Sequence, residues 1–163
     1  MKPLFVLLSA ISFILGMATL LSCQDSLFYS EYKAIPYDQW DSRDTLYFQL
    51  PEAERSFDAT LTISVRTRKN YGYKTIALRV EHLLNGALVN TDTLHITLYD
   101  DNGQPLGRAF PVSDNYSRPL PLHISKNGHH TLRITHAMRL NPLENIPNVG
   151  VFIDRSNQNG MNR

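Results

Sequence analysis

The stretch Thr60-Leu61-Thr62-Ile63-Ser64-Val65-Arg66 decides the fold class, because apolar and polar residues alternate along it. Successive side chains of a β-strand point to opposite faces of a sheet, so a period of two marks a strand with one buried face. We therefore predict a strand at residues 60–66 that contributes Leu61, Ile63 and Val65 to the core.

The same alternation recurs on both sides of this stretch. Further strands are predicted at residues 46–50, 76–81, 94–99, 122–124, 132–134 and 149–153. No long window has the i, i+3, i+4 apolar spacing of a surface helix, so we expect little helix. Short strands separated by turn residues predict an all-β fold, an antiparallel β-sandwich with jelly-roll or immunoglobulin-like connectivity.

Turn residues predict the register of neighbouring strands. Asp101-Asn102-Gly103 suits a hairpin loop that places Leu98 opposite Leu106, with the glycine in a left-handed conformation. The same reasoning places Ile124 opposite Leu132 across the loop 127–129. Asn85-Gly86 marks a third turn.

The N-terminus has the layout of an export signal, in which Lys2 precedes an apolar run over residues 4–21. Leu20-Leu21-Ser22-Cys23 resembles the lipobox of bacterial lipoproteins, which implies cleavage before Cys23 and lipidation of its thiol. The alternative is an uncleaved helix, because the run is near the shortest length that crosses a ~30 Å hydrocarbon core. Gln24 follows the cysteine where aspartate would favour the inner membrane, so we expect an outer-membrane protein that is lipid-anchored on an undecided face.

We divide the chain into four parts. Residues 1–22 are the predicted signal peptide, and residues 23–42 are a lipidated N-terminus followed by an aromatic-rich lead-in. The lead-in carries too many aromatic residues for a solvated tether, so we expect much of it to pack on the sandwich. Residues 43–155 form the predicted β-sandwich, and residues 156–163 a disordered tail.

Composition excludes several classes of function. The net charge is +1, without a block of like charges, so nothing indicates a nucleic-acid partner. The single cysteine excludes an internal disulfide. No nucleophile elbow, phosphate-binding glycine loop or zinc-ligand spacing occurs, so we predict no enzyme and no cofactor.

Two fragments resemble metal ligands. His129 and His130 are neighbours, and neighbours in a strand point to opposite faces, so they do not readily share an ion. Asp100-Asp101-Asn102-Gly103 resembles part of a calcium loop, but Pro111 stands where the bidentate glutamate belongs. We predict no metal site.

Exposed aromatic and basic residues are the candidate binding surface. Arg66, Arg68, Tyr71 and Tyr73 cluster at a strand end and the loop after it, and Trp40 is a further candidate. Such residues suit stacking on sugars or docking of a protein. The alternative is that the aromatic residues only pack the sandwich.

Five segments resemble one known family. They are Arg68-Lys69-Asn70-Tyr71-Gly72-Tyr73, Asp92-Thr93-Leu94, Asp101-Asn102-Gly103 with Leu106-Gly107, His136-Ala137-Met138-Arg139, and Ile146-Pro147-Asn148-Val149-Gly150. In this order they resemble the GldH family of gliding-motility lipoproteins from Bacteroidetes. Gly72 departs from the pattern, since proline is common between the two tyrosines.

The resemblance implies an outer-envelope lipoprotein with a β-sandwich, associated with the machinery of gliding and linked protein secretion. It implies no enzymatic activity. Two alternatives stay open: a surface carbohydrate-binding module that uses Tyr71, Tyr73 and Trp40, and a hydrolase with a carboxylate pair.

Met138 and Arg139 follow the strand at 132–134, and Pro142 and Pro147 prevent a continuous strand beyond them. We predict an ordered structural loop in which Arg139 is fixed by backbone carbonyls or a carboxylate, with Asp154 and Glu144 as candidates.

Overall fold

The computed structural model describes residues 26–107 and 112–155. The signal peptide, Cys23 and the tail 156–163 lie outside these ranges, and their assignments stay predictions. Within the described ranges, no helix is long and apolar enough to cross a membrane.

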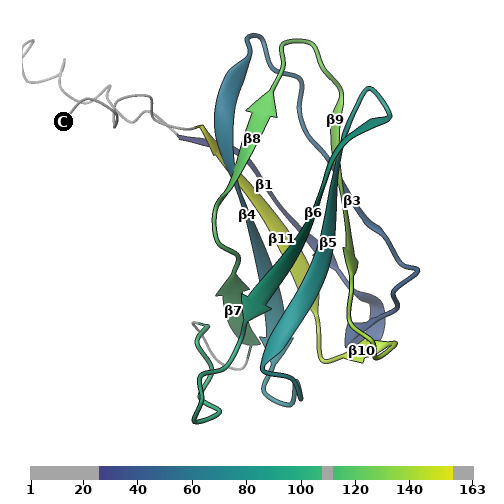
Figure 1. Cartoon of the computed structure of the whole chain (residues 1–163), viewed down its shortest axis with the longest axis vertical. Coiled ribbons are helices and arrows are strands. Elements are labelled where there is room, and N and C mark those ends of the chain that lie inside the picture. Colours follow the sequence, from purple (N-terminus) through teal and green to yellow (C-terminus); the bar gives the residue numbers. More distant parts are fainter. Residues whose placement is uncertain (1–25, 108–111, 156–163) are drawn as a thin grey trace, which may run out of the picture.

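The regular elements of the described chain are strands and one short 3₁₀ turn, joined by loops (Figure 1). In order they are β1 (Leu27–Ala34), η2 (Pro36–Asp38), β2 (Gln39–Trp40), β3 (Leu46–Gln49), β4 (Phe57–Arg68), β5 (Thr75–Leu84), β6 (Ala87–Thr97), β7 (Val112–Tyr116), β8 (Leu120–Ile124), β9 (His130–His136), β10 (Leu143–Glu144) and β11 (Asn148–Arg155).

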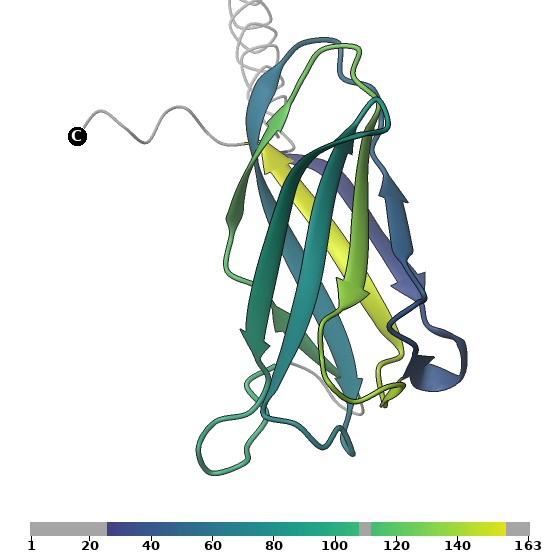
Figure 2. The same cartoon turned by 45° about the vertical axis from the view of Figure 1, so that its right-hand side comes forward.

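Two sheets face each other, as Figure 2 shows with β5, β6 and β9 in front of β11 and β1. The five-stranded sheet has the order β1-β11-β4-β7, and β8 also pairs with β4. The four-stranded sheet has the order β3-β9-β5-β6, and β2 pairs separately with β10. The named strands pair antiparallel, so the predicted all-β antiparallel sandwich is confirmed.

The core lies between the two sheets and follows the alternation read from the sequence. Leu61, Ile63 and Val65 of β4 are buried, as predicted. Their side chains meet Leu78 and Ile134 in the core cluster, which draws on both sheets. Because these side chains leave water, their burial is the main favourable contribution to folding.

Two of the predicted turns are confirmed. Asn85 and Gly86 both have positive φ, 52° and 81°, which is the two-residue turn that suits the twist of a hairpin. Gly103 also has positive φ, and the N–H of Leu106 donates to the carbonyl of Leu98 at 2.9 Å. The predicted register of that hairpin is therefore correct, although Leu106 is exposed.

The predicted pairing of Ile124 with Leu132 is wrong. Ile124 ends β8, which pairs with β4, whereas Leu132 lies in β9 between β3 and β5. The loop after Ile124 carries the chain from one sheet to the other. Both side chains are buried in the same core, but they enter it from opposite sheets. Their shared burial therefore does not show that the two residues pair within one sheet.

The sandwich also begins earlier than the predicted boundary at residue 43. Residues 27–34 form β1, the edge strand of the five-stranded sheet, paired with β11 from Leu27 opposite Asp154 to Ala34 opposite Asn148. A register shift between Leu27 and Tyr29 interrupts this ladder. The predicted lead-in is thus a strand of the sandwich as far as Ala34.

Candidate functional site at one end of the sandwich

Three segments that are distant in sequence meet at one end of the sandwich: the turn 35–38, the loop 69–74 and the loop 137–147. We call this region the motif end. In Figure 1 it is the lower end, where η2, β10 and the β4–β5 loop lie, while β1 begins and β11 ends at the upper end. Two of the segments that carry the resemblance, residues 68–73 and 136–139, therefore come together in space.

Backbone and side-chain contacts hold the three segments together. The N–H of Arg68 donates to the carbonyl of Asn145 at 2.9 Å, and the side-chain amide of Asn145 donates to the carbonyl of Asn70 at 3.2 Å. The guanidinium of Arg68 forms an ion pair with Asp38. The carbonyl of Asp38 accepts a hydrogen bond from Ile146 at 3.1 Å. These contacts give the motif end a defined shape.

Tyr37 is the most prominent side chain of the motif end, with 94% of its surface exposed. It follows Pro36 in a turn that is closed by the N–H of Asp38 donating to the carbonyl of Ile35 at 3.2 Å. The φ of Tyr37 is 55°, a left-handed conformation that glycine adopts more easily at this turn position. The turn therefore holds an aromatic ring in solvent at some cost in backbone strain.

A hollow of about 430 Å³ opens beside Tyr73 in the loop 69–74. Its lining includes Asn70, Tyr73, Leu140, Asn141, Glu144 and Asn145. Tyr73 and Leu140 are partly exposed, at 39% and 51%. The hollow thus combines one aromatic ring and the apolar side chains of Leu140 and Pro142 with three amides and one carboxylate, and aromatic side chains are enriched at protein interfaces.

Two residues of the candidate binding surface are buried, which corrects the prediction. Trp40 is fully buried, and its indole N–H donates to the carbonyl of Asp44 at 2.9 Å. Tyr71 is also buried and packs edge-on against Tyr73, with ring centroids 5.5 Å apart. Burial raises the pKa of the Tyr71 hydroxyl. Neither ring can stack on a ligand, because both belong to the core.

The remaining candidates lie in two places. Arg68 and Tyr73 belong to the motif end. Arg66 lies on the outer face of the five-stranded sheet, where its guanidinium stacks on Tyr32, 4.0 Å from the ring centroid. The phenol of Tyr32 lies 3.3 Å from the hydroxyl of Ser64. Arg66 therefore belongs to an aromatic cluster on the sheet and not to the hollow.

Met138 and Arg139 have different roles. Met138 packs against the core, and its sulfur accepts the N–H of Ala77 at 3.3 Å, so it joins the loop to β5. Arg139 is exposed and forms no ion pair with any residue in the described ranges. The predicted partner Asp154 lies at the opposite end of β11, opposite Leu27 of β1. Within the described ranges Arg139 therefore has neither of the predicted partners, a carboxylate or a backbone carbonyl, and the prediction that it is fixed in the loop is wrong.

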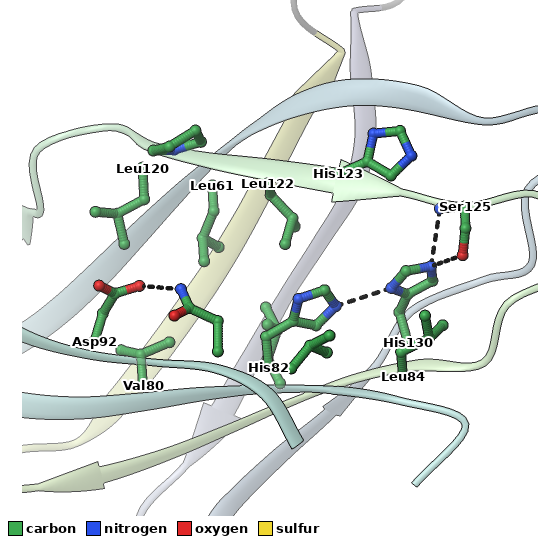
Figure 3. A pocket seen from close by; sticks show the side chains of 14 residues that line it. Leu61, Val80, His82, Leu84, Asp92, Leu120, Leu122, His123, Ser125 and His130 are labelled. Atoms are coloured by element: carbon green, nitrogen blue, oxygen red, sulfur yellow. Dashed lines mark hydrogen bonds between the residues drawn. The ribbon is translucent and has the colours of Figure 1, made fainter. Parts of the chain in front are cut away.

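A pair of histidines lies away from the motif end, between the sheets (Figure 3). His82 and His130 are 2.8 Å apart, from Nε2 to Nδ1. The backbone N–H of Ser125 donates to Nε2 of His130 at 3.0 Å, so this nitrogen carries no proton and Nδ1 donates to His82. Burial lowers the pKa of both imidazoles, so both are neutral near pH 7.

No group of three or more possible metal ligands occurs within the described ranges. His129 lies 3.3 Å from Glu52, whereas His130 contacts His82.

The family model described as GldH lipoprotein matches residues 27–153. The chain belongs to the GldH lipoprotein family. The GldH match spans the described sandwich almost from end to end, including both segments at the motif end. Membership of a lipoprotein family implies that the GldH chain is associated with a membrane through lipid, and the family is not known to be enzymatic. A search of curated proteins gave no significant match.

Several solved structures resemble the GldH chain at low identity. A family 35 carbohydrate binding module from Clostridium thermocellum is 11% identical over 77% of this chain and 88% of its own, with a TM-score of 0.40. The corresponding module of Cellvibrio japonicus Abf62 is 12% identical over 83% and 94%, with a TM-score of 0.39. Dimeric latent PorU from Porphyromonas gingivalis is 13% identical over 80% of this chain and 13% of its own, with a TM-score of 0.36.

The sequence did not point to Tyr37, Leu140 or Asn145 as surface features of this GldH chain. Tyr37 follows Pro36, and proline often occupies the second position of a tight turn, so a turn could have been predicted there. Exposure of Leu140 and the left-handed backbone of Asn145 follow from contacts between distant segments. No local sequence pattern predicts the exposure of Leu140 or the left-handed backbone of Asn145.

Proposed function

We propose that this chain is a non-catalytic outer-envelope lipoprotein whose motif end binds another protein of an assembly associated with gliding motility and protein secretion. The observation that carries the proposal is the convergence of two segments of the resemblance, residues 68–73 and 136–139, on the end of the sandwich that exposes Tyr37, Tyr73 and Leu140. Exposed aromatic and apolar side chains on a rigid frame are typical anchors of protein interfaces.

The position of the proposed lipid anchor is consistent with a motif end that faces away from the membrane. Three residues lie between Cys23 and the start of β1, so four Cα–Cα steps place the lipid within about 14 Å of Leu27. The motif end lies at the other end of β1. A lipid on Cys23 would then leave Tyr37 and the hollow free to contact a partner on the side away from the anchor.

Photo-crosslinking in intact envelopes tests the proposal. A photoreactive phenylalanine replaces Tyr37 in the full lipoprotein, with Cys23 retained, and a second variant carries it at Tyr47, which is also exposed but lies on β3. We expect discrete adducts with an envelope protein from position 37 and none of these from position 47. Equal adducts from both positions, or none from position 37, would contradict the proposal.

Carbohydrate binding is the alternative, and one observation still favours it. Tyr73 lies beside the side-chain amides of Asn70, Asn141 and Asn145, and such a combination can stack on a sugar ring and bond its hydroxyls. Binding on a glycan array that is lost in Tyr73→Ala would support this function. A hydrolase is less well supported, since the hollow at the motif end is lined by a single carboxylate, that of Glu144.

A further inference from the structure

A second hollow, separate from the motif end, opens between the edges of the two sheets. Its volume is about 300 Å³. Figure 3 shows Leu120, Leu122 and Leu61 on one side, facing Val80 and the imidazole of His82 on the other. The exposed side chain of Val89 also lines it. The hollow is therefore largely apolar and reaches the core from the side of the sandwich.

The hollow lies alongside the free edge of β6. β6 pairs with β5 on one side, and on the other side it pairs with no strand of the described chain. An edge strand of this kind presents a row of backbone donors and acceptors that another extended chain can bind. β6 contains no proline, lysine or arginine, which commonly protect such edges. β8, across the hollow, contains Pro121 and lacks one donor.

One carboxylate lies at the rim. Asp92 is partly buried, lines the hollow, and accepts a hydrogen bond from the side-chain amide of Asn90 at 2.7 Å. It has no cationic partner in the described ranges. A lysine or arginine of a bound molecule would complement this charge.

Three features distinguish the possible occupants: the apolar hollow, the free edge of β6 and the carboxylate of Asp92. An acyl chain could fill the apolar part but offers nothing to the backbone of β6 or to Asp92. A sugar ring would need an aromatic platform, and the lining of the hollow contains no phenylalanine, tyrosine or tryptophan. An extended peptide satisfies all three features, because its backbone pairs with the edge while alternate side chains enter the hollow.

We propose that the groove between β6 and β8 binds an extended segment of a partner protein, which adds a strand beside β6. Alternate apolar side chains of this segment fill the hollow next to Val89 and Leu122, and a basic side chain pairs with Asp92. This site is separate from the motif end, so a single lipoprotein can contact two segments or two proteins at once.

Selection from a library of short random peptides tests this proposal on the full lipoprotein in detergent micelles. We expect bound peptides to have apolar residues at alternate positions and a lysine or arginine between them. Val89→Glu should weaken binding of a selected peptide by about tenfold or more, since it places a charge in the apolar hollow. Leu88→Glu is the matched control, because Leu88 is 55% exposed against 56% for Val89 and does not line the hollow.

Further readouts separate the proposal from its rivals. Peptide binding should slow hydrogen exchange of backbone amides in β6, and Asp92→Asn should remove the preference for a basic residue. The proposal is overturned by a library that yields no alternating peptide, or by equal effects of Val89→Glu and Leu88→Glu. It is also overturned if Val89→Glu abolishes self-association or binding of palmitate while peptides do not bind, since the occupant would then be a second copy or a lipid.

Discussion

Replacing Gly150 by alanine should destabilise the sandwich through one side chain, Tyr32. A Cβ at position 150 would lie 2.5 Å from Cε1 and 2.7 Å from Cδ1 of the Tyr32 ring. Ordinary carbon contacts are about 3.5–4.0 Å, so the ring must move by about 1 Å. Tyr32 cannot move without losing contacts, because Arg66 stacks on its ring and Phe152 packs edge-on, with ring centroids 5.5 Å apart.

The size of the effect follows from these contacts. The cation–π contact, the aromatic pair and the bond to Ser64 contribute about 0.5–1.5 kcal/mol each, and displacing the ring loses most of this. Alanine is better than glycine within a strand by about 0.5–1 kcal/mol, which offsets part of the loss. We therefore expect Gly150→Ala to lower the free energy of unfolding by about 1–2 kcal/mol.

Urea unfolding, followed by the fluorescence of the single buried tryptophan, measures this change. Tyr32→Ala provides the control, because in its background a methyl group at position 150 meets no ring. Gly150→Ala should then be neutral or slightly stabilising. A loss of stability that is the same in both backgrounds would refute the reasoning, since the cost would not come from the contact with Tyr32.

Three further predictions follow from burial. Burial lowers the pKa of His82 and His130 from 6.5, so at acidic pH the unfolded chain binds more protons than the folded chain. The free energy of unfolding should therefore be highest above about pH 6.5 and fall below it, by at most about 1.4 kcal/mol per pH unit for each histidine. Urea midpoints that stay constant or rise between about pH 7.5 and about pH 5.5 would contradict this. Arg139→Ala should change the free energy of unfolding by less than about 0.5 kcal/mol, since the side chain is exposed, and a clear drop in melting temperature would indicate a partner that the structure does not show. Trp40→Ala should cost about 3–5 kcal/mol, whereas Tyr73→Ala should cost under about 1 kcal/mol, and similar melting temperatures for the two variants would contradict the assigned burial.

Much of the fold could be predicted from the sequence because β4, β5 and β9 each have one face in the core. Their alternation reflects a physical difference between the two faces of a strand. β1 lacks this pattern, since it is an edge strand with a register shift and its side chains are mostly half-buried. Alternation also does not reveal the chain crossing after Ile124, because residues of opposite sheets share the same core.

The candidate site was predictable only in part. Arg68 and Tyr73 do lie at the surface of the motif end, where the loop after β4 places them. Aromatic residues suit both cores and binding surfaces, so the sequence could not show that Trp40 and Tyr71 are interior. The exposure of Tyr37 depends on a left-handed turn that is held by Ile146, a residue far along the chain.

The course of β1 bears on how the molecule would carry mechanical tension. The strand runs from Leu27 directly into the turn that presents Tyr37. A pull between a lipid at Cys23 and a partner on Tyr37 would pass along the covalent backbone of this one strand. A pull on Tyr73 or Leu140 would instead load the β1–β11 ladder in shear, because its hydrogen bonds lie across the strands and share the force. In both cases the force would be carried without breaking the hydrogen bonds between β1 and β11 one after another.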